Sequence, residues 1–106
     1  MKTPLQPITI AHRWRDHVAV DPVLVREPFA LHRSFGLSGW TVTHIPTGYA
    51  VRTCITSKAA ALRLLRAAVQ QADEHPVLWQ SNDVTRICQS RYRVKMRDAA
   101  KQAMVR

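Results

Sequence analysis

Acidic residues are scarce in this 106-residue chain, which has seven Asp or Glu against sixteen Lys or Arg and a formal net charge of +9 at pH 7. With so few carboxylates, the chain has few candidates for a pair spaced for acid–base catalysis. A protein this basic is attracted to polyanions such as nucleic acid, or to acidic protein surfaces. We therefore expect a binding protein rather than an enzyme, with no catalytic residue.

Cysteine and glycine are also rare, with two and three copies. Neither Cys54 nor Cys88 belongs to a CxxC motif, so neither indicates a zinc site or a redox pair. We expect both to be reduced and buried as small apolar side chains. The sequence has no Gly-rich phosphate loop and no nucleophile elbow. The five histidines have no Cys or carboxylate at customary ligand spacing, so we predict no metal and no cofactor.

Long apolar runs are missing as well. No stretch approaches the roughly 18 apolar residues of a membrane span. Residues 1–10 contain two prolines and no continuous apolar segment of the kind found in signal peptides. We expect a cytoplasmic protein. Apolar residues make up 46% of the chain, enough for one core at this length.

Proline divides the chain into two parts. Residues 1–28 contain four of the six prolines, so we expect an N-terminal arm of extended pieces or edge strands. The sequence leaves open whether this arm is ordered over the core or flexible. Residues 29–106 are predicted to form a single domain that ends in a basic helix.

Three stretches of alternating, β-branched-rich sequence predict an antiparallel meander over residues 29–35, 40–45 and 49–55. The second hairpin has two registers that the sequence leaves open. A bulged loop pairs Ile45 with Tyr49 and places Val42 on one face with Arg52. A tight two-residue turn places His44 opposite Tyr49 instead.

A helix is predicted over residues 58–72, because Thr56 or Ser57 can cap its start and Pro76 disfavours its continuation. Helical spacing assigns its buried stripe to Leu62, Leu65, Val69 and Ala72. The neighbouring stripe, which we expect to be exposed, consists of Arg63, Arg66 and Gln70.

A second helix is predicted over residues 82–104, and its length would be about 33 Å at 1.5 Å per residue. Residues 86–106 contain seven Lys or Arg and one acid, Asp98. Cations spread around an exposed arc can each contact a phosphate and release a counterion. The residues expected to bind nucleic acid or an acidic partner are Arg86, Arg91, Arg93, Lys95, Arg97 and Lys101.

The sheet is a second candidate surface. Arg33 and Arg52 are expected to project with Thr41 and Thr43 from the face opposite the first helix. Small sheets enter the DNA major groove, where Arg and Thr suit guanine edges and thymine methyls. Two helical residues, Arg63 and Arg66, extend the same positive charge.

A short motif marks the predicted hairpin, and it reads Trp40-x-Val42-Thr43-His44-x-Pro46-Thr47-Gly48. Together with the strand and the Ala-rich helix that follow, it resembles small accessory proteins of phages and other bacterial mobile elements, over residues 29–79. The strand–strand–strand–helix order also resembles the sheet-reading DNA-binding domains of phage integrases. The resemblance implies a bacterial host cell, and such small phage proteins include anti-CRISPR inhibitors of host effector complexes.

These observations predict an α+β fold, with a three- or four-stranded antiparallel sheet, one packed helix and a long basic C-terminal helix. The leading hypothesis is a non-catalytic nucleic-acid-binding accessory protein of a phage or mobile element. The alternative is an anti-CRISPR-type inhibitor that binds a bacterial defence effector complex and blocks its access to nucleic acid. A third hypothesis is a homodimer formed through the C-terminal helix.

Overall fold

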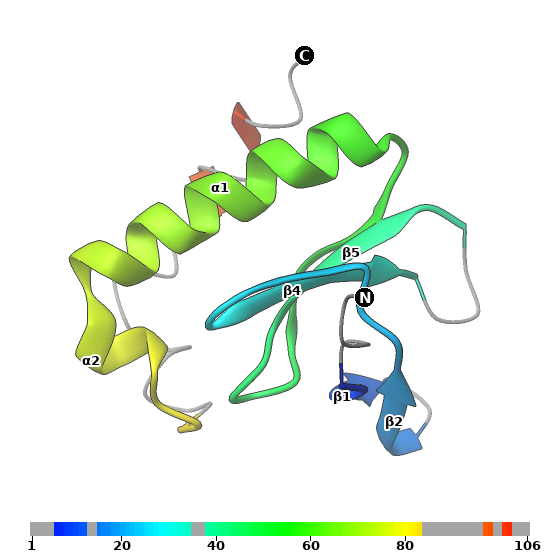
Figure 1. Cartoon of the computed structure of the whole chain (residues 1–106), viewed down its shortest axis with the longest axis horizontal. Coiled ribbons are helices and arrows are strands. Elements are labelled where there is room, and N and C mark those ends of the chain that lie inside the picture. Colours follow the sequence, from blue (N-terminus) through cyan, green and yellow to red (C-terminus); the bar gives the residue numbers. More distant parts are fainter. Residues whose placement is uncertain (1–5, 13–14, 35–37, 84–96, 99–100, 103–106) are drawn as a thin grey trace, which may run out of the picture.

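The computed structural model describes residues 6–12, 15–34, 38–83, 97–98 and 101–102. Over these residues the fold is α+β, as predicted. It comprises a two-stranded hairpin, a four-stranded antiparallel sheet, one 17-residue helix on that sheet and a short second helix (Figure 1).

The four-stranded sheet has the order β3-β4-β5-β6, and each strand is antiparallel to the next. Its strands are β3 (Leu24–Arg26), β4 (Phe29–Arg33), β5 (Trp40–His44) and β6 (Ala50–Ile55). The last three are the predicted meander. The first comes from the Pro-rich stretch and lies at the edge of the sheet, where a strand flanked by prolines is tolerated.

One face of the sheet is covered by α1 (Lys58–Glu74), which lies across β4, β5 and β6 (Figure 1). The helix begins as predicted, because the Ser57 hydroxyl accepts a hydrogen bond of 3.1 Å from the Ala60 amide. It ends before Pro76, and α2 (Pro76–Trp79) follows directly. Both Leu78 and Trp79 are buried against the same core.

The predicted buried stripe of α1 is wrong in part, since Leu62 and Val69 are only half-buried. Alanine explains the difference, because four small side chains allow the helix to approach the sheet along a neighbouring line. The residues of α1 that are buried are Ala60, Ala61, Leu64, Leu65, Ala68 and Ala72. They pack against four sheet residues, Phe29, Leu31, Val42 and Ile55.

The opposite face of the sheet carries a hairpin made of β1 (Ile8–His12) and β2 (Arg15–Val20). Ile8 and Ile10 are buried together with Ala30 of β4 in a second apolar cluster. The described part of the Pro-rich stretch is therefore ordered over the core: α1 covers one face of the sheet, and this hairpin packs on the other face around Ala30 (Figure 1).

The β5–β6 hairpin combines features of the two predicted registers. Val42 pairs with Arg52, as the bulged alternative requires, and Gly48 has a φ of 75°. The amide of His44 donates to the Tyr49 carbonyl at 2.9 Å, as in the tight-turn alternative. The register shifts twice along this pair, and these bulges accommodate both sets of contacts.

Most of the predicted helix over residues 82–104 lies outside the described residues. Arg97 and Lys101 are described, and both are helical and exposed. At the predicted start of this helix, Asn82 and Asp83 are described and are not helical, and the Ser81 hydroxyl accepts a hydrogen bond of 3.0 Å from the Asp83 amide. In the described part of the chain, no helix has the length and apolar character needed to cross a membrane.

Candidate functional site

Two cations and one aromatic ring meet at the end of the sheet where α1 begins. The guanidinium carbon of Arg33 lies 4.2 Å from the centroid of the Trp40 ring, and the Lys58 ammonium lies 5.5 Å from the same ring. Trp40 is half-buried, whereas Arg33 and Lys58 are exposed. We call these three residues the Trp40 cluster. Both distances are within the range of cation–π attraction.

The strand pattern explains how the Trp40 cluster forms. Arg33 follows Phe29 and Leu31 in the alternation of β4, so it lies on the side of the sheet that faces α1. It is directly opposite Trp40 on β5. Lys58 is the first residue of α1, immediately after the Ser57 cap. A β4–β5 hairpin and the start of α1 thus bring the three side chains to one place.

The prediction that Arg33 projects from the face opposite the helix is therefore wrong. Thr41 and Thr43 do lie on the face opposite the helix, opposite His32 and Ala30, but they are 4% and 1% accessible instead of exposed. The β1–β2 hairpin lies on that side of the sheet, against Ala30. Threonines buried to this extent cannot present their methyl groups to a DNA groove.

Hydrogen bonds among neighbouring side chains satisfy the buried threonines. Thr43 Oγ1 lies 2.7 Å from His32 Nε2, and Thr41 Oγ1 lies 2.8 Å from Ser34 Oγ and 2.9 Å from Thr53 Oγ1. Buried hydroxyls with partners of this kind stabilise a polar layer inside the fold. The layer is structural, and its polar atoms are directed at one another.

The two buried histidines contribute no positive charge to the site. Burial lowers the pKa of His32 and of His44 below the ordinary value, so both are neutral near pH 7. His44 Nε2 bonds the Trp79 carbonyl and its Nδ1 lies 2.9 Å from Thr47 Oγ1. These bonds tie the β5–β6 loop to α2.

The charge of the Trp40 cluster is not neutralised locally. Within the described ranges, neither Arg33 nor Lys58 has a carboxylate partner, and the first turn of α1 contains no acid. A cation held against an aromatic ring keeps its outer N–H groups available for an anion. The cluster is therefore an anion-attracting surface with one half-exposed aromatic ring.

The other predicted binding residues are dispersed. Arg52 is exposed on β6 and Arg66 is exposed on α1, while Arg63 is half-buried and makes an interaction within the fold. Arg97 and Lys101 are exposed. The predicted residues that lie outside the described part of the chain are Arg86, Arg91, Arg93 and Lys95.

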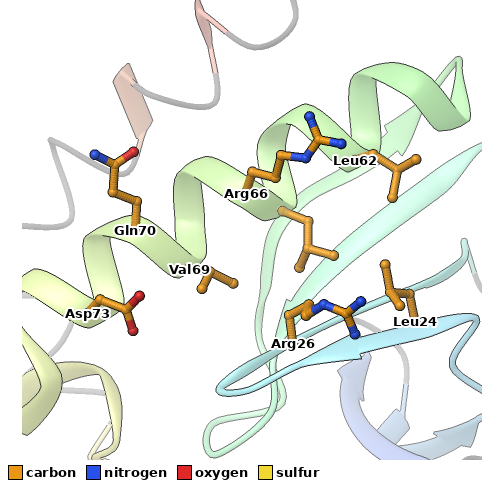
Figure 2. Close-up of a pocket in the computed structure, with 8 residues that line it drawn as sticks. Leu24, Arg26, Leu62, Arg66, Val69, Gln70 and Asp73 are labelled. Carbon is orange, nitrogen blue, oxygen red and sulfur yellow. The ribbon is translucent and has the colours of Figure 1, made fainter.

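Sequence reasoning missed Trp40, Lys58 and Arg26 as site residues. The sequence did contain a signal for Trp40, since the predicted strands over residues 29–35 and 40–45 flank a short turn and place Arg33 near Trp40. Arg26 lies with Arg66 at a groove between β3 and α1, which has a volume of about 370 Å³ (Figure 2). The groove is lined by Leu24, Arg26, Leu62, Leu65, Arg66, Val69, Gln70 and Asp73.

Cys54 is exposed, which contradicts the prediction that it packs as a small apolar residue. It lies where β6 shifts register, and its φ is 56°. Its amide donates to Ser34 Oγ at 3.2 Å. The neighbouring Gly39 has a φ of 93°, and a Cβ there would lie 2.7 Å from the Ile55 carbonyl oxygen. The bulge therefore directs the thiol outward, whereas Cys88 lies outside the described residues.

Comparison of the chain with protein-family models, with curated proteins and with solved structures finds no match. Within the described ranges, no three His, Cys, Asp or Glu side chains gather as a metal site would require.

Proposed function

We propose that this protein binds nucleic acid without catalysis, as an accessory protein of a phage or mobile element, and that the Trp40 cluster contacts phosphates. The observation that carries the proposal is the stacking of the exposed Arg33 guanidinium on Trp40, with Lys58 beside the same ring. Phosphate recognition favours arginine because its planar N–H fork matches two phosphate oxygens.

Preorganisation supports the assignment of Arg33 to this role. A free surface arginine loses side-chain entropy when it binds, of the order of 1 kcal/mol or more. Contact with the Trp40 ring restricts the guanidinium before any ligand arrives. Lys58, by contrast, supplies a mobile point charge that tolerates variation in phosphate position.

Long-range charge supports the same proposal. The chain carries +9 overall, and six of those charges are the net contribution of residues 86–106, from seven cations and one acid. Arg97 and Lys101 from that stretch are exposed, as is Arg52 on β6. Such a distribution increases the rate of encounter with a polyanion, and the effect weakens as salt screens it.

The proposal is tested by fluorescence anisotropy with labelled DNA and RNA oligonucleotides at low salt. Arg33→Ala and Lys58→Ala are each expected to weaken binding by roughly five- to tenfold, the loss of one phosphate contact. Arg26→Ala is the matched control, because it removes one exposed charge from β3, opposite Phe29 and therefore at the other end of β4 from Arg33. If all three variants lost the same affinity, the effect would be due to net charge alone, and the Trp40 cluster would be refuted as the phosphate-binding site.

A second candidate function is an anti-CRISPR-type inhibitor that binds a bacterial defence effector complex and blocks its access to nucleic acid. The groove between β3 and α1 favours this candidate, because its floor of aliphatic side chains suits a protein better than a phosphate backbone. Co-purification of this chain with a defence nuclease after nuclease treatment would support it.

A further inference from the structure

The groove between β3 and α1 is a second surface, separate from the Trp40 cluster in the residues that form it. Leu24, Leu62 and Val69 are half-buried along it, and Leu65 is buried at its base. Its α1 wall extends from Leu62 to Asp73, which is about 16 Å at 1.5 Å per residue. That length accommodates about five residues of extended chain at 3.3 Å each.

Two arginines flank this apolar floor from opposite walls. Arg26 comes from β3 and Arg66 from α1 (Figure 2). Both are exposed. Arg26 Nη1 donates a hydrogen bond of 2.9 Å to the Val25 carbonyl, and this bond holds the Arg26 side chain along the strand. Neither arginine pairs with a carboxylate within the part of the chain that the structure describes. The groove therefore offers two uncompensated cations beside an aliphatic surface.

Asp73 and Gln70 give the groove a polarity along its length. Asp73 lies seven residues after Arg66 on α1, which is about two helical turns or 10 Å. One end of the groove thus favours carboxylates, and the other favours a donor or a cation. A ligand that carries both apolar and acidic side chains fits this arrangement in one direction only.

The lining argues against nucleic acid as the occupant. None of the eight lining residues is aromatic, so the groove has no ring on which a base can stack. A ribose-phosphate backbone is polar, so it would cover the aliphatic floor of the groove without making apolar contacts to it. The adjacent β3 is an edge strand, and extended peptides commonly bind beside such strands.

We propose that this groove binds an extended segment of a partner protein in which apolar and acidic side chains alternate. The apolar side chains seat on Leu24, Leu62 and Val69, and the carboxylates pair with Arg26 and Arg66. This surface is additional to the nucleic-acid contacts proposed above. It gives the protein a means of holding a protein partner while the Trp40 cluster contacts phosphates.

The test uses a short, acetylated and fluorescently labelled peptide of alternating glutamate and leucine, titrated with the full chain at near-physiological salt. Arg26→Ala and Arg66→Ala are each expected to lower its affinity by roughly fivefold or more. Arg52→Ala is the matched control, since it removes an equal charge from the exposed β6 strand at the other edge. It should change the affinity less than twofold.

Two further probes separate groove binding from general attraction. A peptide with glycine in place of leucine should bind at least several-fold more weakly, because the aliphatic floor would be left uncovered. Binding that is absent, or equally weakened by Arg52→Ala, would overturn the proposal. Displacement of the peptide by an oligonucleotide whose own binding depends on Arg26 and Arg66 would also overturn it. Arg33→Ala should leave peptide affinity unchanged, so this test can fail independently of the nucleic-acid test.

Discussion

The guanidinium of Arg33 stacks 4.2 Å from the ring centroid of Trp40, directly across the β4–β5 pair. A cross-strand pair of this kind fixes both the position and the orientation of a surface cation. Its neighbour Lys58 adds a second charge at the start of α1. The proposed phosphate contact depends on this geometry more than on the number of basic residues in the chain.

Trp40 is therefore expected to act through Arg33. Trp40→Ala should weaken nucleic-acid binding by about threefold, because the guanidinium loses its support. In an Arg33→Ala background the same change should have little further effect, which a double-mutant cycle on the dissociation constants will measure. Trp40→Phe keeps an aromatic face and should retain most of the affinity. Additive losses from the two alanine substitutions would contradict the positioning role.

The two buried histidines predict a pH-dependent stability. Burial lowers the pKa of His32 and of His44 in the folded chain, while the unfolded chain protonates them near pH 6.5. Their contribution to the free energy of unfolding is then fully present above about pH 6.5 and decreases as the pH falls below that value. The free energy of unfolding changes with pH by at most about 1.4 kcal/mol per pH unit for each histidine, and it levels off below the folded-state pKa.

Urea unfolding between about pH 7.5 and pH 5 measures this slope above the range where carboxylates titrate. His32→Asn removes one of the two proton acceptors and should make the curve shallower. A free energy of unfolding that stays constant over this range in the wild-type chain would show that the two histidines can be protonated without loss of the fold.

The corrected buried face of α1 predicts unequal effects from two leucines. Leu64 is fully buried, so Leu64→Ala should cost about 2–5 kcal/mol in the free energy of unfolding. Leu62 is half-buried at the groove, and Leu62→Ala should cost roughly half as much or less. Chemical denaturation of the two variants compares them directly. Equal losses would favour the stripe that helical spacing alone predicts.

The Ser57 cap gives a smaller and equally specific prediction. Ser57→Ala removes the acceptor for the Ala60 amide and should destabilise the fold by about 1 kcal/mol. Thr56→Ala is the control, because Thr56 precedes the cap and is exposed. Thermal unfolding of both variants should show a decrease only for Ser57→Ala, and the reverse order would mean that Thr56 caps the helix.

The strands and α1 were predictable because alternation, capping and proline are local signals. The meander over residues 29–55 and the helix start after Ser57 follow from them. The buried face of α1 was harder to predict, since helical spacing cannot distinguish two adjacent stripes when alanines permit close approach. The burial of Thr41 and Thr43 depends on tertiary contacts, since their hydroxyls bond His32, Ser34 and Thr53 from neighbouring segments.

The site was predictable only as a positive charge. The sequence predicted Arg33 and Arg66 as binding residues, because strand alternation and helical spacing placed these cations on surfaces. It missed Trp40 and Arg26, whose roles come from a cross-strand pairing and from a groove between β3 and α1. Neighbours of this kind are fixed by register and packing, so a charge count does not reveal them.

The salt dependence of DNA binding tests the central claim most directly. For double-stranded DNA, the logarithm of the association constant should fall against the logarithm of salt concentration with a slope near −5, from about six phosphate contacts at ~0.9 each. Arg33→Ala should make this slope shallower by about 0.9, and Arg26→Ala should leave it unchanged. An absence of binding at about 50 mM salt, or a slope that Arg33→Ala does not alter, would contradict phosphate binding by the Trp40 cluster.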